Sequence, residues 1–174
     1  MLHVSIPGFG DYRLEELVLD YNGTLAIAQE HLVSEMLRTL LGSMLRLFRP
    51  PNPAVTMVLS TPAGESHEFG ILAAAMLASL AGVDPVFLGP NLPAREIADA
   101  ARRTSAKVIA MSITFPSETT QEELNALAAA MPEDAELWVG GASSADLDLT
   151  HLGRKTVWIK DLPAFENECR RWSN

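Results

Sequence analysis

From residue 55 onward, short apolar runs alternate with longer stretches of helical periodicity. The apolar runs predict strands at residues 55–60, 85–88, 107–113, 136–139 and 156–159. The stretches between and after them predict helices at residues 68–81, 94–104, 117–131, 142–152 and 163–172. Strands that alternate with helices are joined by right-handed crossovers and lie parallel in one sheet. The fold class is therefore α/β, with a five-stranded parallel sheet and flanking helices.

The chain before this region has a different pattern. Residues 2–6 alternate like a strand, and apolar residues at helical spacing predict an amphipathic helix over residues 27–48. Prolines at 50, 51 and 53 end that helix and form a stiff linker. We therefore predict two parts: residues 1–49, an N-terminal segment whose long helix forms a cap or partial bundle, and residues 54–174, a flavodoxin-like α/β domain. The apolar stripe of the long helix needs a partner, which is either this domain or another subunit.

Charge and composition exclude several classes of function. The formal net charge is −9, and lysines and arginines form only short pairs such as Arg102-Arg103, so we expect no direct nucleic-acid binding by this chain. No apolar run reaches the roughly 18 residues of a membrane span, and the N-terminus lacks the basic start and apolar core of a signal peptide. Cys169 is the one cysteine, which fits a reducing compartment. We expect a cytoplasmic protein without a membrane partner.

The loop after the strand at 55–60 carries Gly64-Glu65-Ser66-His67-Glu68-Phe69-Gly70. It lies at the carboxyl edge of the predicted sheet, where open α/β sheets bind their ligands. Glu65 is close enough along the chain to hold one ring nitrogen of His67 and to leave the other nitrogen for a metal. The alternative is an ordinary helix-start histidine beside a capping acid.

Two more strand ends carry small or hydroxyl residues. Ser112 and Thr114 follow one apolar run, and Gly140-Gly141 follows another; 41 residues separate Gly70 from Ser112, and 25 separate Thr114 from Gly140. Paired glycines let a ring approach the backbone closely, and hydroxyls offer hydrogen bonds. Each signal also has a local explanation, since Gly-Gly is often a turn and Ser or Thr often satisfies nearby backbone groups.

In this order and spacing, the three motifs resemble the cobalamin-binding domain of methionine synthases and corrinoid mutases, whose pattern is Asp-x-His-x-x-Gly, then Ser-x-Leu, then Gly-Gly. Glu65 stands where that family has Asp, and Thr114 stands where it has Leu. Residues 61–70, which begin Thr-Pro-x-Gly-Glu, are still more similar to the effector domains of MerR-type, CarH-like light and cobalamin sensors. The resemblance covers roughly residues 27–160.

The resemblance implies that cobalamin is the cofactor, with His67 as the lower axial ligand of cobalt and Glu65 as the partner that orients it. The nucleotide tail of the cofactor would then leave the cobalt and enter a slot in the protein, beside the paired glycines. The cofactor-binding residues expected in this domain are Thr61, Glu65, His67, Gly70, Ser112, Thr114, Gly140 and Gly141.

Glu30 and His31 lie near the start of the predicted N-terminal helix. In the CarH-like sensors, a Glu-His pair at this point of a helical bundle lies over the upper face of cobalamin, and we expect these two residues to bind the cofactor. Those sensors also carry a Trp ten residues before the Glu, where this chain has Asp20, so a response to light is left open. The alternative for His31 is an exposed helix residue.

Residues 17–24, within the first 26 residues, resemble the first motif of haloacid-dehalogenase-type phosphatases. In that family the residue at the position of Asp20 is the nucleophile that takes up phosphate beside magnesium. Asn22 occupies the second acidic position, which would leave no carboxylic acid to protonate the leaving group. The alternative is a turn at Asn22-Gly23 between two packed elements.

The leading interpretation is a cobalamin-binding sensory or effector domain of a transcriptional regulator rather than an enzyme. Its partners would be a second copy of the chain or a separate regulator. Two enzymatic alternatives stay open: a corrinoid methyl carrier for a methyltransferase, and a phosphatase that uses Asp20.

Overall fold

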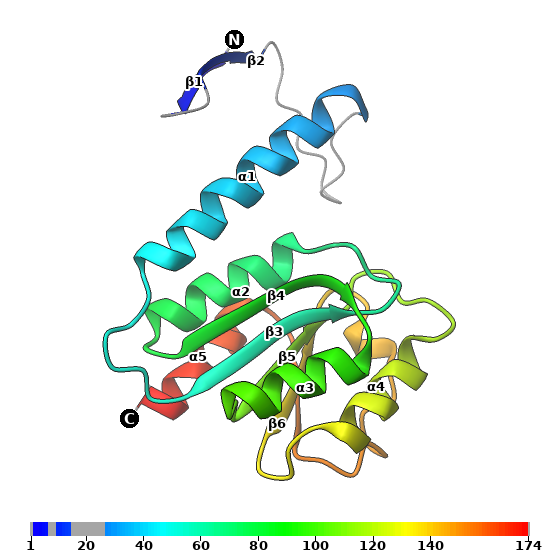
Figure 1. The fold of residues 1–174 in the computed structure, drawn as a ribbon. Helices are drawn as coiled ribbons and strands as arrows, with labels where there is room; N and C mark the ends of the chain where they lie inside the picture. Colours follow the sequence, from blue (N-terminus) through cyan, green and yellow to red (C-terminus); the bar gives the residue numbers. More distant parts are fainter. Residues whose placement is uncertain (1, 7–9, 15–26, 174) are drawn as a thin grey trace. The chain divides into compact units, whose positions relative to one another are not determined.

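The computed structural model describes residues 2–6, 10–14 and 27–173, with side chains described from residue 34 to residue 172 (Figure 1). The chain forms two compact units, Met1–Thr39 and Leu40–Asn174. In the first unit, β1 (Leu2–Ile6) pairs antiparallel with β2 (Gly10–Leu14). Helix α1 (Ile27–Leu47) begins in this unit and ends in the second.

The second unit contains a five-stranded parallel sheet with the strand order β4-β3-β5-β6-β7. Its strands are β3 (Thr56–Pro62), β4 (Asp84–Leu92), β5 (Val108–Ser112), β6 (Glu136–Gly140) and β7 (Thr156–Ile159). Its remaining helices are α2 (Phe69–Leu80), α3 (Ala94–Thr104), α4 (Thr120–Ala130) and α5 (Leu162–Ser173). The predicted flavodoxin-like α/β fold is therefore confirmed.

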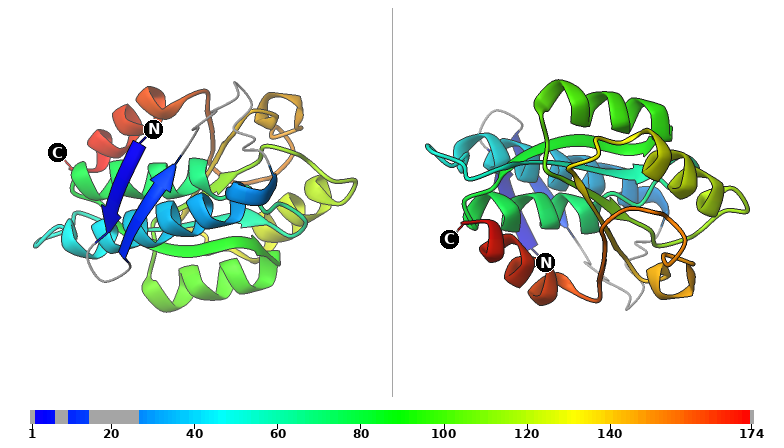
Figure 2. Two further views of the ribbon diagram at one scale, coloured as in Figure 1. Left: turned by 90° about the horizontal axis from the view of Figure 1, so that it is seen from above. Right: turned by 90° about the horizontal axis from the view of Figure 1, so that it is seen from below.

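Alternating residues of the strands build one core on each face of the sheet. On one face, Val58 and Ile109 pack with residues of α3 and α4, such as Ile97. On the other, Met57 and Trp138 pack with residues of α2 and α5. Figure 2 shows the sheet between these two helical layers. The small side chains of α2, which include fully buried alanines, let this helix lie close to the sheet.

Three local predictions differ from the structure. Residues 89–93 were expected to form a turn, but β4 continues to Leu92, with register shifts against β3 and positive φ angles at Gly89 (+92°) and Asn91 (+60°). These irregularities let the strand bend and still pair. The helix expected at 142–152 is a single 3₁₀ turn, Ser144–Asp146. Helix α4 starts at Thr120 rather than at 117, because residues 117–119 form a turn in which Thr120 Oγ1 accepts the Ser117 N–H.

Within the second unit, the segment after α1 is fixed by two side-chain contacts. Arg49 donates from Nε and Nη2 to the two carboxylate oxygens of Asp84, at 2.9 Å each. The Ser79 hydroxyl donates to the Phe48 carbonyl oxygen at 2.5 Å. Both contacts join the chain before β3 to the α2–β4 region.

Among the helices of the described residues, none combines the length and apolar character needed to cross a membrane.

Candidate functional site

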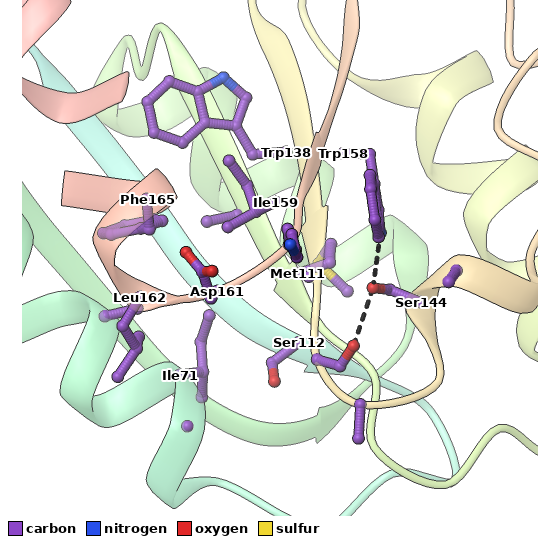
Figure 3. Close-up of a pocket in the computed structure, with 18 residues that line it drawn as sticks. Ile71, Met111, Ser112, Trp138, Ser144, Trp158, Ile159, Asp161, Leu162 and Phe165 are labelled. Carbon is purple, nitrogen blue, oxygen red and sulfur yellow. Dashed lines mark hydrogen bonds between the residues drawn. The ribbon is translucent and has the colours of Figure 1, made fainter. Parts of the chain in front are cut away.

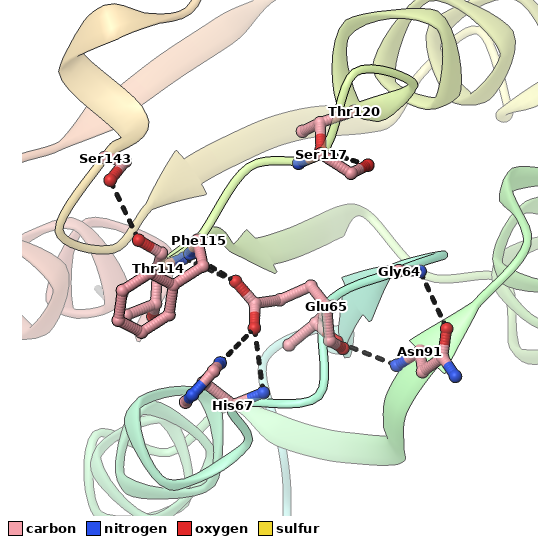
Figure 4. A network of polar contacts seen from close by, with 10 residues as sticks. Gly64, Glu65, His67, Asn91, Thr114, Phe115, Ser117, Thr120 and Ser143 are labelled. Atoms are coloured by element: carbon pink, nitrogen blue, oxygen red, sulfur yellow. Dashed lines mark hydrogen bonds and ion pairs between the residues drawn. The ribbon is translucent and has the colours of Figure 1, made fainter. Parts of the chain in front are cut away.

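The loop between β3 and α2 is fastened to the end of β4. The buried Thr61 hydroxyl donates to the Glu65 carbonyl oxygen at 2.5 Å and accepts the Asn91 N–H at 2.8 Å. The N–H of Gly64, whose φ is +88°, donates to Asn91 Oδ1 at 2.7 Å (Figure 4). The extension of β4 that the sequence did not predict therefore braces the loop that carries Glu65 and His67.

The Glu65 carboxylate is 2% exposed, and four hydrogen bonds hold it. Oε2 accepts the N–H groups of Thr114 at 2.8 Å and Phe115 at 2.6 Å, and Oε1 accepts the N–H of His67 at 2.9 Å. Oε1 also lies 2.6 Å from His67 Nδ1. Burial on its own raises the pKa of Glu65, but the hydrogen bonds from Phe115, His67 and Thr114 outweigh it and lower the pKa below its ordinary value. The carboxylate is thus ionised at neutral pH.

The His67 imidazole is oriented from two sides. An ionised carboxylate can only accept hydrogen bonds, so Nδ1 carries the proton that is donated to Glu65 Oε1. In the neutral imidazole with its proton on Nδ1, Nε2 has the free lone pair, and the side chain is 58% exposed. The Phe115 ring lies with its centroid 4.5 Å from that of the imidazole, at an interplanar angle of 52°. This arrangement offers one nitrogen donor, in a fixed orientation, to a metal.

A cavity of about 300 Å³ opens beside this loop, at the carboxyl ends of β5, β6 and β7 (Figure 3). Helix α2 and the start of α5 form its other walls. Four of the residues expected to bind the cofactor line it: Gly70, Ser112, Gly140 and Gly141. Among the described residues, Ser112 Oγ has no hydrogen-bond partner, and Ser112 is 8% exposed.

The other expected residues lie outside the cavity lining. Glu65 and His67 lie on the adjoining loop, and Thr61 is buried beneath that loop. Thr114 takes part through its backbone, since its N–H donates to Glu65 and its carbonyl oxygen accepts the Ser143 hydroxyl at 2.8 Å. Glu30 and His31 belong to α1, and their side chains fall outside the described part of the chain. Asp20 also lies outside the described residues.

Close backbone approach requires the paired glycines. A Cβ on Gly141, where φ is +102°, would lie 2.6 Å from the Ile113 backbone nitrogen. A Cβ on Gly140 would lie 3.1 Å from the Ile159 carbonyl oxygen. A side chain at 141 would therefore clash with the Ile113 backbone, and one at 140 would crowd Ile159, so the paired glycines keep the strand ends close and leave this wall of the cavity open.

The sequence reasoning missed several residues that line the cavity. Trp158 is 49% exposed, and its indole Nε1–H donates to Ser144 Oγ at 3.0 Å. Ser144 Oγ in turn donates to the Gly141 carbonyl oxygen at 2.8 Å. Trp158 reaches the cavity because β6 pairs with β7. That pairing puts Trp158 opposite Val139, directly before the glycine pair. Other lining residues that were not predicted as site residues include Ile71, Trp138, Ile159, Asp161 and Phe165.

Comparison with known proteins gives a family and a relative. The B12-binding domain family matches residues 55–153. The HTH-type transcriptional repressor CarH of Myxococcus xanthus is 34% identical over 125 residues, which cover 71% of this chain and 42% of the relative. The chain therefore spans less than half the length of that repressor.

Two solved structures share the fold. The methanol:cobalamin methyltransferase complex of Methanosarcina barkeri matches with a TM-score of 0.61 at 16% identity, covering 87% of this chain and 59% of that chain. The monomethylamine corrinoid protein of the same organism matches with a TM-score of 0.60 at 14% identity, covering 84% of this chain and 72% of that chain.

The family match spans more than half of the chain and includes the loop of His67 and the paired glycines. The chain belongs to the B12-binding domain family, and cobalamin is its cofactor.

Proposed function

We propose that this chain is the cobalamin-binding sensory domain of a transcriptional regulator and that His67 is the lower axial ligand of cobalt. The observation that carries the ligand assignment is the pairing of His67 Nδ1 with the buried, ionised Glu65, which leaves Nε2 as a donor on a half-exposed ring. The regulator assignment is supported by the 34% identity with the CarH repressor.

The residues fit a corrinoid bound in this way. A cavity of about 300 Å³ is at the small end of ligand pockets, so it suits part of a cobalamin, such as the nucleotide tail, rather than the macrocycle. At Gly70, Gly140 and Gly141, no side chain covers the edge of the cavity. When bound, cobalamin supplies a cobalt centre whose upper ligand can change, which is the property that a sensor can report.

Each polar residue of the loop has a distinct part in this proposal. Glu65 fixes the tautomer of His67 and raises the donor strength of Nε2. Thr61 acts through the loop, because its hydroxyl is already bonded to Glu65 and Asn91. Ser112 is the side-chain hydroxyl placed to bind the tail, and Thr114 contributes its N–H to Glu65. The roles of Glu30 and His31, and the division into residues 1–49 and 54–174, stay predictions.

Electron paramagnetic resonance of the reduced cobalt(II) form tests the ligand directly. In protein labelled with ¹⁵N-histidine, we expect the nitrogen splitting of the cobalt signal to change from a triplet to a doublet. Protein without the label keeps the triplet. His67→Ala removes the doublet in labelled protein, and His151→Ala, which changes an exposed histidine beside Asp148, retains it. A triplet in the labelled parent protein would show that cobalt keeps the tail base, and the assignment of His67 would be wrong.

The sensor and the methyl carrier differ in the consequence of cofactor binding. For a sensor, cobalamin changes the association of the chain with itself or with a regulator, which light scattering measures as a change in mass. Illumination of the adenosylcobalamin complex reverses that change if light is sensed, and leaves it unaltered in a plain cobalamin sensor. Methyl transfer from a methyltransferase partner to the bound corrinoid, without a change in association, would favour the methyl carrier instead.

A further inference from the structure

We propose that the cavity selects the base of the nucleotide tail, accepting a benzimidazole in preference to a purine, with Trp158 as a specificity-determining residue. This inference rests on the proposed function, because the tail is free to enter the cavity only when His67 replaces its base at cobalt.

The inner walls of the cavity are apolar and closely packed. Trp138 and Phe165 are 0% and 3% exposed, and their rings meet edge to face with centroids 5.6 Å apart at 84°. Ile71 and Ile159, at 2% and 7% exposure, complete this part of the lining. A flat apolar ring placed against this part of the lining gains apolar contact.

The polar hydrogens on these walls are already bonded. Trp138 Nε1–H donates to Glu136 Oε2 at 3.0 Å, and Trp158 Nε1–H donates to Ser144 Oγ, also at 3.0 Å. The one hydrogen of the Ser144 hydroxyl goes to the Gly141 carbonyl oxygen at 2.8 Å. The half-exposed Trp158 indole therefore presents ring carbon to the cavity, the Trp138 indole is buried behind the lining, and neither N–H is free to donate to a bound base.

The remaining polar side chains suit the ribose and phosphate of a tail. Lys160 and Asp161 are exposed where the chain enters α5, and Ser112 lies at the end of β5. Asp161 Oδ1 already accepts the Ala164 N–H at 2.8 Å. Figure 3 shows Trp158 and Phe165 on opposite sides of the residues that line the cavity.

These walls distinguish the two kinds of base by their polar atoms. The benzene ring and methyl groups of dimethylbenzimidazole need no hydrogen-bond partner. A purine such as adenine carries additional ring nitrogens and an amino group, and each of these that loses water without gaining a partner weakens binding. We therefore expect at least about a tenfold preference for the benzimidazole, the scale of discrimination by one unpaired polar group.

Spectroscopic titration with three hydroxo-corrinoids tests this inference. Cobalamin carries dimethylbenzimidazole, pseudocobalamin carries adenine, and cobinamide lacks the nucleotide. The parent protein should bind cobalamin about tenfold or more tightly than pseudocobalamin. Trp158→Ala should reduce that ratio at least threefold or so and leave cobinamide affinity unchanged, because it removes only a wall that touches the base.

Two control variants distinguish the effect of the aromatic ring of Trp158 from that of the lysine charge in the lining. Trp158→Phe retains an aromatic wall without the indole N–H and should keep most of the preference, and Lys160→Ala changes a lining charge and should keep all of it. Equal affinities of the parent protein for the two cobamides, or tighter binding of pseudocobalamin through Asp161, would overturn the inference even if Trp158→Ala fails to fold.

If the isotope experiment shows histidine ligation and the cobamides bind equally, only this inference fails. If the isotope experiment shows no histidine ligation, the proposed function fails.

Discussion

At the scale of single residues, the Glu65 carboxylate holds together two loops that are far apart in the sequence. It binds the N–H groups of Thr114 and Phe115 after β5, as well as the backbone and ring of His67. Such a residue acts on the metal ligand and on the stability of the loop at once. A substitution that removes its charge should therefore change both.

Glu65→Gln tests this double role. The amide has only one acceptor oxygen, and its N–H₂ group would face backbone donors, so we expect a loss of about 1–3 kcal/mol of unfolding free energy. Cobalamin affinity should fall by about 10–100-fold, the usual effect of losing the partner of a metal-bound histidine. Urea unfolding and visible titration measure the two effects. Glu118→Gln, on an exposed side chain of the β5–α4 loop, is the control and should change neither. Parental affinity in Glu65→Gln would contradict the orienting role.

The ring of Phe115 should affect the cofactor more than the fold. It is 58% exposed and contacts the imidazole, and its backbone N–H to Glu65 survives any side-chain change. We expect Phe115→Ala to weaken cobalamin binding by about 3–10-fold, in line with about 0.5–1.5 kcal/mol for an aromatic pair. The free energy of unfolding should change by less than about 0.5 kcal/mol. Equal titration curves for Phe115→Ala and the parent protein would show that the ring has no positioning role.

At the scale of elements, the site depends on how strand ends meet. The loop after β6 passes so close to β5 that Ile113 donates to the Gly140 carbonyl oxygen at 2.8 Å, and Ser143 donates to the Ile113 carbonyl oxygen at 3.2 Å. This close approach brings Ser144, and with it Trp158, to the cavity. The geometry of one loop thus sets two walls of the cavity.

Gly141→Ala measures the importance of that approach. The variant must tolerate a φ of +102° and a Cβ 2.6 Å from the Ile113 nitrogen, so we expect a loss of about 2–4 kcal/mol of unfolding free energy. Gly153→Ala is a matched control, because φ is +64° there but a Cβ would meet nothing within 4 Å. It should cost only about 1 kcal/mol. Denaturant unfolding distinguishes the two, and equal losses would mean that strain, rather than the contact with Ile113, limits this position.

The sequence predicted what depends on local pattern and missed what depends on tertiary contact. Strand and helix periods placed the five parallel strands, and the Glu65-x-His67 spacing placed a carboxylate beside a ring nitrogen. The extension of β4 was not predicted, because Gly89 and Asn91 are typical turn residues, and only the pairing of Gly89 and Leu92 with β3 shows that the strand continues. Trp158 was missed, because its place beside the cavity follows from the neighbour order of β6 and β7, which its own stretch of sequence does not encode.

At the scale of the whole molecule, Glu136 joins elements that are distant in the sequence. It is 5% exposed, and its carboxylate binds Lys155 before β7, the indole N–H of Trp138 and, at 2.8 Å, Arg171 of α5. Burial on its own raises the pKa of Glu136, but the bonds from Lys155 and Trp138 and the charge of Arg171 outweigh it and lower the pKa. The carboxylate therefore stabilises the folded chain in its ionised form.

This network gives the molecule a predictable dependence on pH. Because the pKa of Glu136 is lower in the folded chain than its ordinary value of 4.5, its contribution is fully present above about pH 4.5 and is lost as the pH falls through the folded pKa. Glu136→Gln should lower the unfolding free energy at pH 7 by about 1–3 kcal/mol and flatten its decline below about pH 4.5. Asp134→Asn is the control. The exposed Asp134 also has its pKa lowered by its ion pair with Lys107. Solvent screens this pair, so the pH dependence of the unfolding free energy of Asp134→Asn should stay close to that of the parent protein. Denaturant unfolding between pH 3 and 7, about the range over which carboxylates titrate, measures all three proteins. Parallel curves for Glu136→Gln and the parent would mean that Glu136 is not the group through which acid destabilises the sheet and α5.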